Sequence, residues 1–202
     1  MYYLYLIGAL ARHEAQYNDF RKRHAHHWEG QMEASDEAEE LRIPIILVTA
    51  CLVEALANVY LALKLKKGFD KKLEYETPTV KKWCSIPAKF LPGYTLPADI
   101  QADIESLFQR RNGLAHLKEE IEVDGTIIHK GNLPDSSASE DATLARWISL
   151  PLELIFNLQK FDRSPEGSMM PHSVEMHLGI ARANELRRRA PKLPPKVRRQ
   201  RG

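Results

Sequence analysis

Three residues near the middle of the chain, Arg111, Asn112 and His116, have the types and spacing that suit phosphodiester chemistry. A guanidinium can stabilise the charge that builds on a phosphate during cleavage, and an imidazole that titrates near neutrality can transfer the proton. Asn112 and His116 are four residues apart, so on a helix they are neighbours and the amide can fix the orientation of the imidazole. Gly113, between them, leaves room for a ligand or a partner helix. This segment is the candidate active centre.

The segment around Arg111 has the periodicity of an amphipathic helix that places this charge within an apolar face. At about 100° per residue, Arg111 falls at the centre of the apolar face of residues 98–118. The apolar members of that face are Ile100, Ile104, Leu107, Phe108, Leu114 and Ala115. Burying an uncompensated charge costs several kcal/mol, so Arg111 must meet a carboxylate or border a wet cleft.

A second charge, Glu54, lies in the most apolar segment of the chain, residues 41–66, with Asn58 one turn later. We expect this segment to form a central helix that packs on the helix of Arg111, with Glu54 and Asn58 orienting the guanidinium. The alternative is a membrane span over Ile43–Leu65, which is long enough to cross a bilayer. An acidic side chain in the middle of a span costs about 2.5 to 3.5 kcal/mol, which favours the core helix and no membrane.

The segment also resembles the motif of the HEPN superfamily, which comprises helical nucleotide-binding and ribonuclease domains of toxin–antitoxin, abortive-infection and RNA-processing systems. That motif is an arginine, usually a polar residue, then three to five positions and a histidine. Arg111-Asn112-x-x-x-His116 matches it in the form Arg-Asn-x-x-Ala-His. A lysine two positions after the histidine, here Lys118, also occurs in many members.

The resemblance covers roughly residues 40–120, because the Ala50–Asn58 helix is similar to the one that packs on the motif helix in such domains. It implies an all-α fold, an up-and-down helical bundle of four to six helices, which forms a homodimer with both motifs lining one cleft. It also implies metal-independent RNA cleavage without a cofactor, with Arg111 and His116 as the catalytic pair and Asn112 in support. An antitoxin or another regulatory protein is a further implied partner.

Two functions therefore stay open. The first is a HEPN-type endoribonuclease or RNA-binding toxin or defence protein, in which Glu54, Asn58 and Lys118 support the catalytic pair. The second is a non-catalytic helical scaffold, or a nucleotide- or partner-binding module, in which an Arg111–Glu54 pair is structural. The second predicts that replacing Arg111 strands Glu54 and lowers the stability strongly, while RNA stays intact.

The first half of the chain predicts two further helical regions. The apolar stretch Tyr2–Leu10 begins a helix, and the charged residues 11–40 continue as a long solvated helix. Gly68 is expected to close the central helix at its carboxyl end. Residues 76–97 contain four prolines and predict short helical turns and a packed loop, anchored by Trp83 and Phe90.

The second half predicts a small β insertion followed by helices. Alternating apolar residues flank Asp124-Gly125, which predicts a β-hairpin insertion at about 119–130. Residues 144–161 predict one or two short helices, with Pro151 at a helix start. A last helix is expected over Ser173–Arg189.

Length and charge predict one domain over residues 1–190 and a basic, disordered tail over 191–202. Residues 182–202 hold nine Lys and Arg against one Glu, whereas the whole chain has a formal net charge of +2, so the remainder is net acidic. The tail can contact RNA phosphates or serve only to solubilise the protein.

The cysteines and histidines indicate the cellular compartment and whether a metal site is present. The two cysteines, Cys51 and Cys84, are typical of buried small hydrophobes in a reducing compartment, which predicts a cytoplasmic protein. His24, His26 and His27, with His13 upstream, allow a metal site, but a solvated basic helix surface explains them better, and no metal is predicted.

Overall fold

Residues 2–27, 36–115, 121–123, 126–129 and 140–164 of the chain are described by a computed structural model. Helices dominate this part, so the protein is all-α as predicted. The long helices are α1 (Tyr2–Arg23), α2 (Asp36–Leu65), α4 (Ala98–Ala115) and α5 (Glu140–Phe161). The short ones are η1 (Ala25–His27), η3 (Lys66–Gly68), η4 (Lys72–Glu76), α3 (Thr79–Trp83) and η5 (Pro87–Lys89). The strands β1 (Ile121–Val123) and β2 (Thr126–His129) pair antiparallel.

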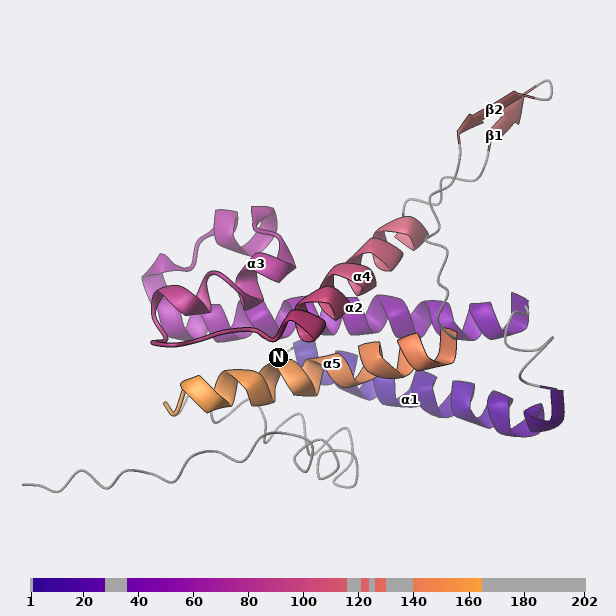
Figure 1. Ribbon diagram of the computed structural model, residues 1–202, viewed down its shortest axis with the longest axis horizontal. Coiled ribbons are helices and arrows are strands. Elements are labelled where there is room, and N and C mark those ends of the chain that lie inside the picture. Colours follow the sequence, from indigo (N-terminus) through magenta and orange to yellow (C-terminus); the bar gives the residue numbers. More distant parts are fainter. Residues whose placement is uncertain (1, 28–35, 116–120, 124–125, 130–139, 165–202) are drawn as a thin grey trace, which may run out of the picture.

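The long helix α2 is the centre of the fold. It contacts α1, α3, α4 and α5, and Figure 1 shows α1 and α5 lying along it while α4 crosses it obliquely. Leu52, Val53, Leu56 and Leu61 are fully buried in these contacts. Each such side chain contributes about 1.5 to 3 kcal/mol relative to its exposed state, so α2 is the main source of the core. The expectation of a central core helix is met.

Helix α1 is shorter and less solvated than expected. Ile7, Leu10, Tyr17 and Phe20 are all buried, and their spacing of three, seven and three residues keeps them on one face. The expected solvated helix over residues 11–40 is therefore wrong in two respects. Its first half buries an apolar face against α2, and the helix ends at Arg23, after which α2 begins at Asp36.

The carboxyl end of α2 is closed by Lys66 and not by Gly68. The chain leaves α2 after Leu65 through the 3₁₀ turn η3, and Lys66 has a φ of 50°, in the left-handed region. The amide of Phe69 donates to the carbonyl oxygen of Lys66 at 3.1 Å, which closes the turn. A non-glycine residue in this conformation costs about 1 to 2 kcal/mol, so the packing that follows η3 must hold it.

Helix α5 is continuous, whereas the sequence predicted one or two short helices with Pro151 at a start. Pro151 lies inside the helix, where it removes one backbone hydrogen bond. Leu150, Leu152, Leu154 and Ile155 on both sides of it are fully buried. Burial along the whole length therefore outweighs the local cost of the proline.

The segment between α2 and α4 follows the expectation of short turns anchored by aromatic residues. Trp83 is fully buried, and its indole Nε1–H donates to the carbonyl oxygen of Val53 in α2 at 3.1 Å. The hydroxyl of Tyr94 donates to the carbonyl oxygen of Trp83 at 2.6 Å, and Phe90 packs against the core. These contacts fix α3 between α2 and α4.

Several expectations lie outside the described residues: the hairpin turn at 124–125, the helix over Ser173–Arg189 and the tail over 191–202. The expectation of two buried cysteines is wrong for Cys51, which is exposed because it lies on the least buried side of α2. Cys84 is half-buried. Burial raises the pKa of the Cys84 thiol.

Candidate functional site

Helix α4 presents the apolar face that the sequence predicts, with Arg111 on its margin. Ile104 and Leu107 are fully buried, and Ile100 and Leu114 pack against the core. Arg111 follows Leu107 by one helical turn and is half-buried. The sequence predicts Arg111 at the centre of this face, whereas the structure has it half-buried at the margin, where it lines a pocket.

The guanidinium of Arg111 lies over an aromatic ring and beside open space. Its central carbon is 4.9 Å from the centroid of the Phe108 ring, a distance at which the cation is attracted by the π face. Its Nε is buried without a hydrogen-bond partner, and no carboxylate of the described residues lies within ion-pair distance of it. The group is therefore a cation with unused hydrogen-bond donors.

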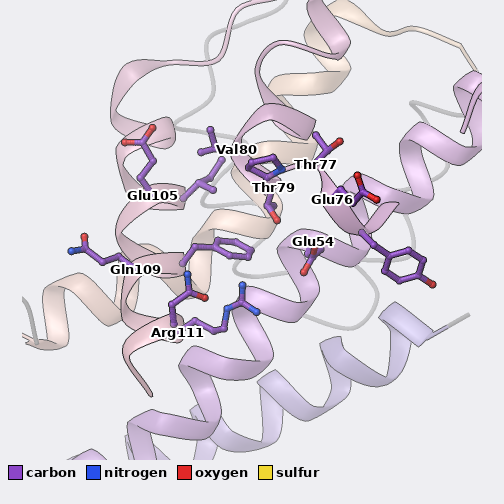
Figure 2. A pocket seen from close by; sticks show the side chains of 13 residues that line it. Glu54, Glu76, Thr77, Thr79, Val80, Glu105, Gln109 and Arg111 are labelled. Carbon is purple, nitrogen blue, oxygen red and sulfur yellow. The ribbon is translucent and has the colours of Figure 1, made fainter. Parts of the chain in front are cut away.

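That space is a pocket of about 540 Å³ between three elements. Helix α2 contributes one wall, the segment from η4 to α3 contributes a second, and α4 the third (Figure 2). The lining residues are Glu54, Tyr75, Glu76, Thr77, Pro78, Thr79, Val80, Ile104, Glu105, Phe108, Gln109, Arg111 and Asn112. Figure 2 shows the Arg111 side chain directed into this space from α4, with Glu54 on the opposite side.

The expected contact between Glu54 and Arg111 is not formed, although both residues line the pocket. The carboxylate Oε1 of Glu54 lies 3.4 Å from the ammonium Nζ of Lys82 in α3, a residue that is 1% exposed. The same ammonium donates to the carbonyl oxygen of Glu74 at 2.5 Å. A fully buried ammonium needs a carboxylate more than a half-buried guanidinium does, which explains the exchange of partners.

The other predicted site residues are placed unequally. Asn112 is exposed at the edge of the pocket, whereas Asn58 does not line it, and the amide oxygen of Asn58 is buried without a hydrogen-bond partner. Asn58 therefore does not orient the guanidinium in this structure. His116 and Lys118 lie outside the described residues, and His116 directly follows the last residue of α4 in the sequence.

A partly buried network of charges, which the sequence analysis missed, joins α1, α2, α4 and α5. The Nε–H of Arg42 donates to the hydroxyl of Tyr17 at 2.8 Å, and Tyr17 in turn donates to the carboxylate of Asp141. Arg21 lies 2.9 Å from the same carboxylate, and Arg42 lies 3.5 Å from it. Residues from α1, α2 and α5 thus meet at one carboxylate.

The network reaches α4 through Glu39, which lies 3.7 Å from Arg42 and also accepts from Arg110, the neighbour of Arg111. Burial and the hydrogen bond to Asp141 raise the pKa of Tyr17, so the phenol stays protonated. Burial opposes the charge of Arg42, but Tyr17 and the two carboxylates outweigh it, and the pKa of Arg42 is raised. The sequence signal was an arginine in the second turn of a highly apolar helix.

The histidine-rich segment does not assemble into a metal site within the described part of the chain, where no group of three or more His, Cys, Asp or Glu residues is suitably placed. His24 instead lies against Phe20, with the ring centroids 4.5 Å apart, and its Nδ1 is 3.1 Å from the Phe20 carbonyl oxygen.

The candidate membrane span is partly buried in the folded chain. By length and composition, one helical stretch of the described residues, Asp36–Gly68, could cross a membrane, and 56% of its most apolar window is buried inside the protein. That burial is typical of a core helix.

Comparison of the chain with protein families, with curated proteins and with solved structures gives no match.

Proposed function

We propose that the protein is a HEPN-type, metal-independent endoribonuclease of the toxin or defence class, acting in the cytoplasm as a homodimer. In this proposal the helices form an up-and-down bundle, and the pocket beside Arg111 receives the scissile phosphate. Arg111 stabilises the negative charge of the transition state, and His116 transfers the proton. A cognate antitoxin or regulatory protein would cover the same cleft.

The observation that carries the proposal is that the Arg111 guanidinium has unused hydrogen-bond donors. It borders a pocket of about 540 Å³, and no described carboxylate neutralises it. An arginine in an apolar helix face with unused donors is suited to an incoming anion, because phosphate oxygens accept its N–H groups in a bidentate manner. The ion pair between Glu54 and Lys82 supports this, because it partly neutralises a carboxylate that lines the same pocket.

The non-catalytic alternative required a structural pair between Arg111 and Glu54. Since Glu54 is paired with Lys82 instead, removal of Arg111 leaves that ion pair in place. The two functions therefore predict different melting temperatures and different rates of RNA cleavage for Arg111→Ala.

The test is RNA cleavage and thermal unfolding of Arg111→Ala and His116→Ala, with EDTA present to exclude metal ions. We expect each variant to lose at least about a hundredfold in cleavage rate while its melting temperature stays close to that of the wild type. Arg12→Ala is the matched control, because Arg12 is exposed on α1 and away from the pocket. Unchanged cleavage by both variants would remove the catalytic assignment, and a large loss of stability in Arg111→Ala with intact RNA would favour the scaffold.

A further inference from the structure

The segment that forms one wall of the pocket is unusually rich in lysine. Residues 64–89 carry eight lysines against three acids. Two of the lysines, Lys64 and Lys82, are held in ion pairs with Asp162 and Glu54. The other six form no ion pair with any residue that the structure describes, and all are exposed: Lys66, Lys67, Lys71, Lys72, Lys81 and Lys89.

Several other exposed or half-exposed cations of the described residues are paired. Arg21 pairs with Asp141, Arg23 pairs with Asp19, and Arg146 lies 3.5 Å from Asp103. Of the exposed cations in the described residues that form no ion pair, six lie within residues 64–89 and the other three are Arg12, Lys22 and Arg163, so most of the unpaired positive charge is on the segment that borders the pocket. Ammonium groups without protein partners are the groups that bind backbone phosphates and release counterions.

An exposed aromatic residue lies among these lysines in the sequence. Tyr75 is 74% exposed and also lines the pocket. It belongs to the π-helical turn η4, as does Lys72, and Lys81 directly follows the lining residue Val80. Isolated π-helical turns are frequent at functional sites.

Two hydrogen bonds hold the backbone of the turn that carries Tyr75. The fully buried ammonium of Lys82 donates to the carbonyl oxygen of Glu74, and the hydroxyl of Thr77 donates to that of Lys72 at 3.3 Å. A fixed backbone lowers the entropy lost when an exposed aromatic side chain takes up a ligand. The turn therefore presents its phenol ring to solvent from a fixed position.

We infer that Tyr75 stacks a nucleobase of single-stranded RNA at the rim of the pocket, while Lys72 and Lys81 hold the adjoining backbone phosphates. Aromatic stacking with flanking cations is the usual composition of single-strand binding surfaces, and an A-form duplex would leave no base free to stack. The inference rests on the proposed function, since it delivers the strand to Arg111. The carboxylates at the rim, such as Glu76, can accept hydrogen bonds from exocyclic amino groups of the base.

The experiment measures binding separately from cleavage. A short fluorescein-labelled single-stranded 2′-O-methyl oligoribonucleotide, which lacks the attacking hydroxyl, is titrated with the full chain and followed by fluorescence anisotropy. We expect Tyr75→Ala to weaken binding about tenfold and Tyr75→Phe to keep it. Lys72→Gln should weaken binding and lower the dependence on salt by about one counterion.

Matched controls come from α1. Tyr5 is 78% exposed and Lys22 is exposed, and neither lines the pocket, so Tyr5→Ala and Lys22→Gln should bind as the wild type does. If Tyr75→Ala binds as tightly as Tyr5→Ala, or if the wild type does not bind the probe, the inference is overturned. Tyr75-dependent binding with cleavage that does not need Arg111 would keep the inference and reject the proposed catalytic function. Cleavage that needs Arg111 without Tyr75-dependent binding would do the reverse.

Discussion

At the scale of single residues, the site is defined by two cations with different surroundings. Lys82 is 1% exposed and has a carboxylate and a carbonyl oxygen as partners, whereas Arg111 has the face of Phe108 and open space. The first is held by the protein and the second is available to a ligand. The sequence predicted the odd position of Arg111 from helical periodicity. It did not predict the partner of Glu54, because Lys82 is 28 residues away in the chain and no local spacing connects the two.

Glu54→Ala is predicted to lower the free energy of unfolding by about 3 kcal/mol, because it leaves the buried ammonium of Lys82 without a carboxylate. Chemical denaturation measures this. The double variant Glu54→Ala/Lys82→Met should recover a large part of the loss, since it removes the stranded charge as well. Glu105→Ala is the matched control on the same pocket, because Glu105 is exposed and forms no ion pair with a described residue. A double variant as unstable as Glu54→Ala would contradict the pairing.

At the scale of elements, burial along a helix outweighs local signals at its ends and within it. Pro151 and Gly68 are both strong local signals, yet α5 continues through the first and α2 ends before the second. Helix existence was predictable from apolar periodicity, as α4 shows. Helix ends were not, because they depend on contacts between residues far apart in the chain, such as those of Asp162 with α2.

The junction between the ends of α2 and α5 gives a prediction with a pH dependence. Asp162 is buried, accepts from the hydroxyl of Tyr60 at 2.8 Å and pairs with Lys64 at 2.8 Å. Burial raises its pKa, but the hydrogen bonds from Lys64 and Ser164 outweigh this, so the folded-state pKa is lowered. The carboxylate therefore stabilises the fold above its ordinary pKa, and that contribution is lost as the pH falls through the folded value.

Asp162→Asn should accordingly lower the melting temperature at neutral pH, and the difference from the wild type should shrink in strongly acidic solution. Thermal unfolding across a pH series measures this. Asp19→Asn is the control, since Asp19 forms an exposed pair with Arg23. A difference that grows as the pH falls would contradict the assignment.

At the scale of the whole molecule, Asp141 joins three helices that the sequence could place only separately. Asp141 lies at the start of α5, and its carboxylate contacts Tyr17 and Arg21 of α1 and Arg42 of α2. The all-α class and the central position of α2 were predictable from composition and apolar patterning. The charge network around Asp141 was not predictable, because its members are isolated polar residues in segments that the sequence analysis interpreted as solvated or apolar.

Asp141→Asn is predicted to lower the free energy of unfolding by about 3 kcal/mol, because Arg42 is 2% exposed and would lose its closest link to α5. Denaturant unfolding measures the loss. The exposed pair variant Asp19→Asn should stay within about 1 kcal/mol of the wild type. Equal effects of the two substitutions would show that the junction contributes no more than a surface pair.

The most direct measurement of the central claim is single-turnover cleavage of single-stranded RNA by wild type, Arg111→Lys and Arg111→Ala in EDTA, with melting temperatures recorded in parallel. The account predicts that both variants unfold close to the wild-type temperature, that the alanine variant loses at least about a hundredfold in rate, and that lysine restores only part of it because an ammonium cannot bind a phosphate in a bidentate manner. If the alanine variant cleaves at the wild-type rate, or if its melting temperature falls far below that of the wild type, the claim that this guanidinium is available to a ligand is contradicted.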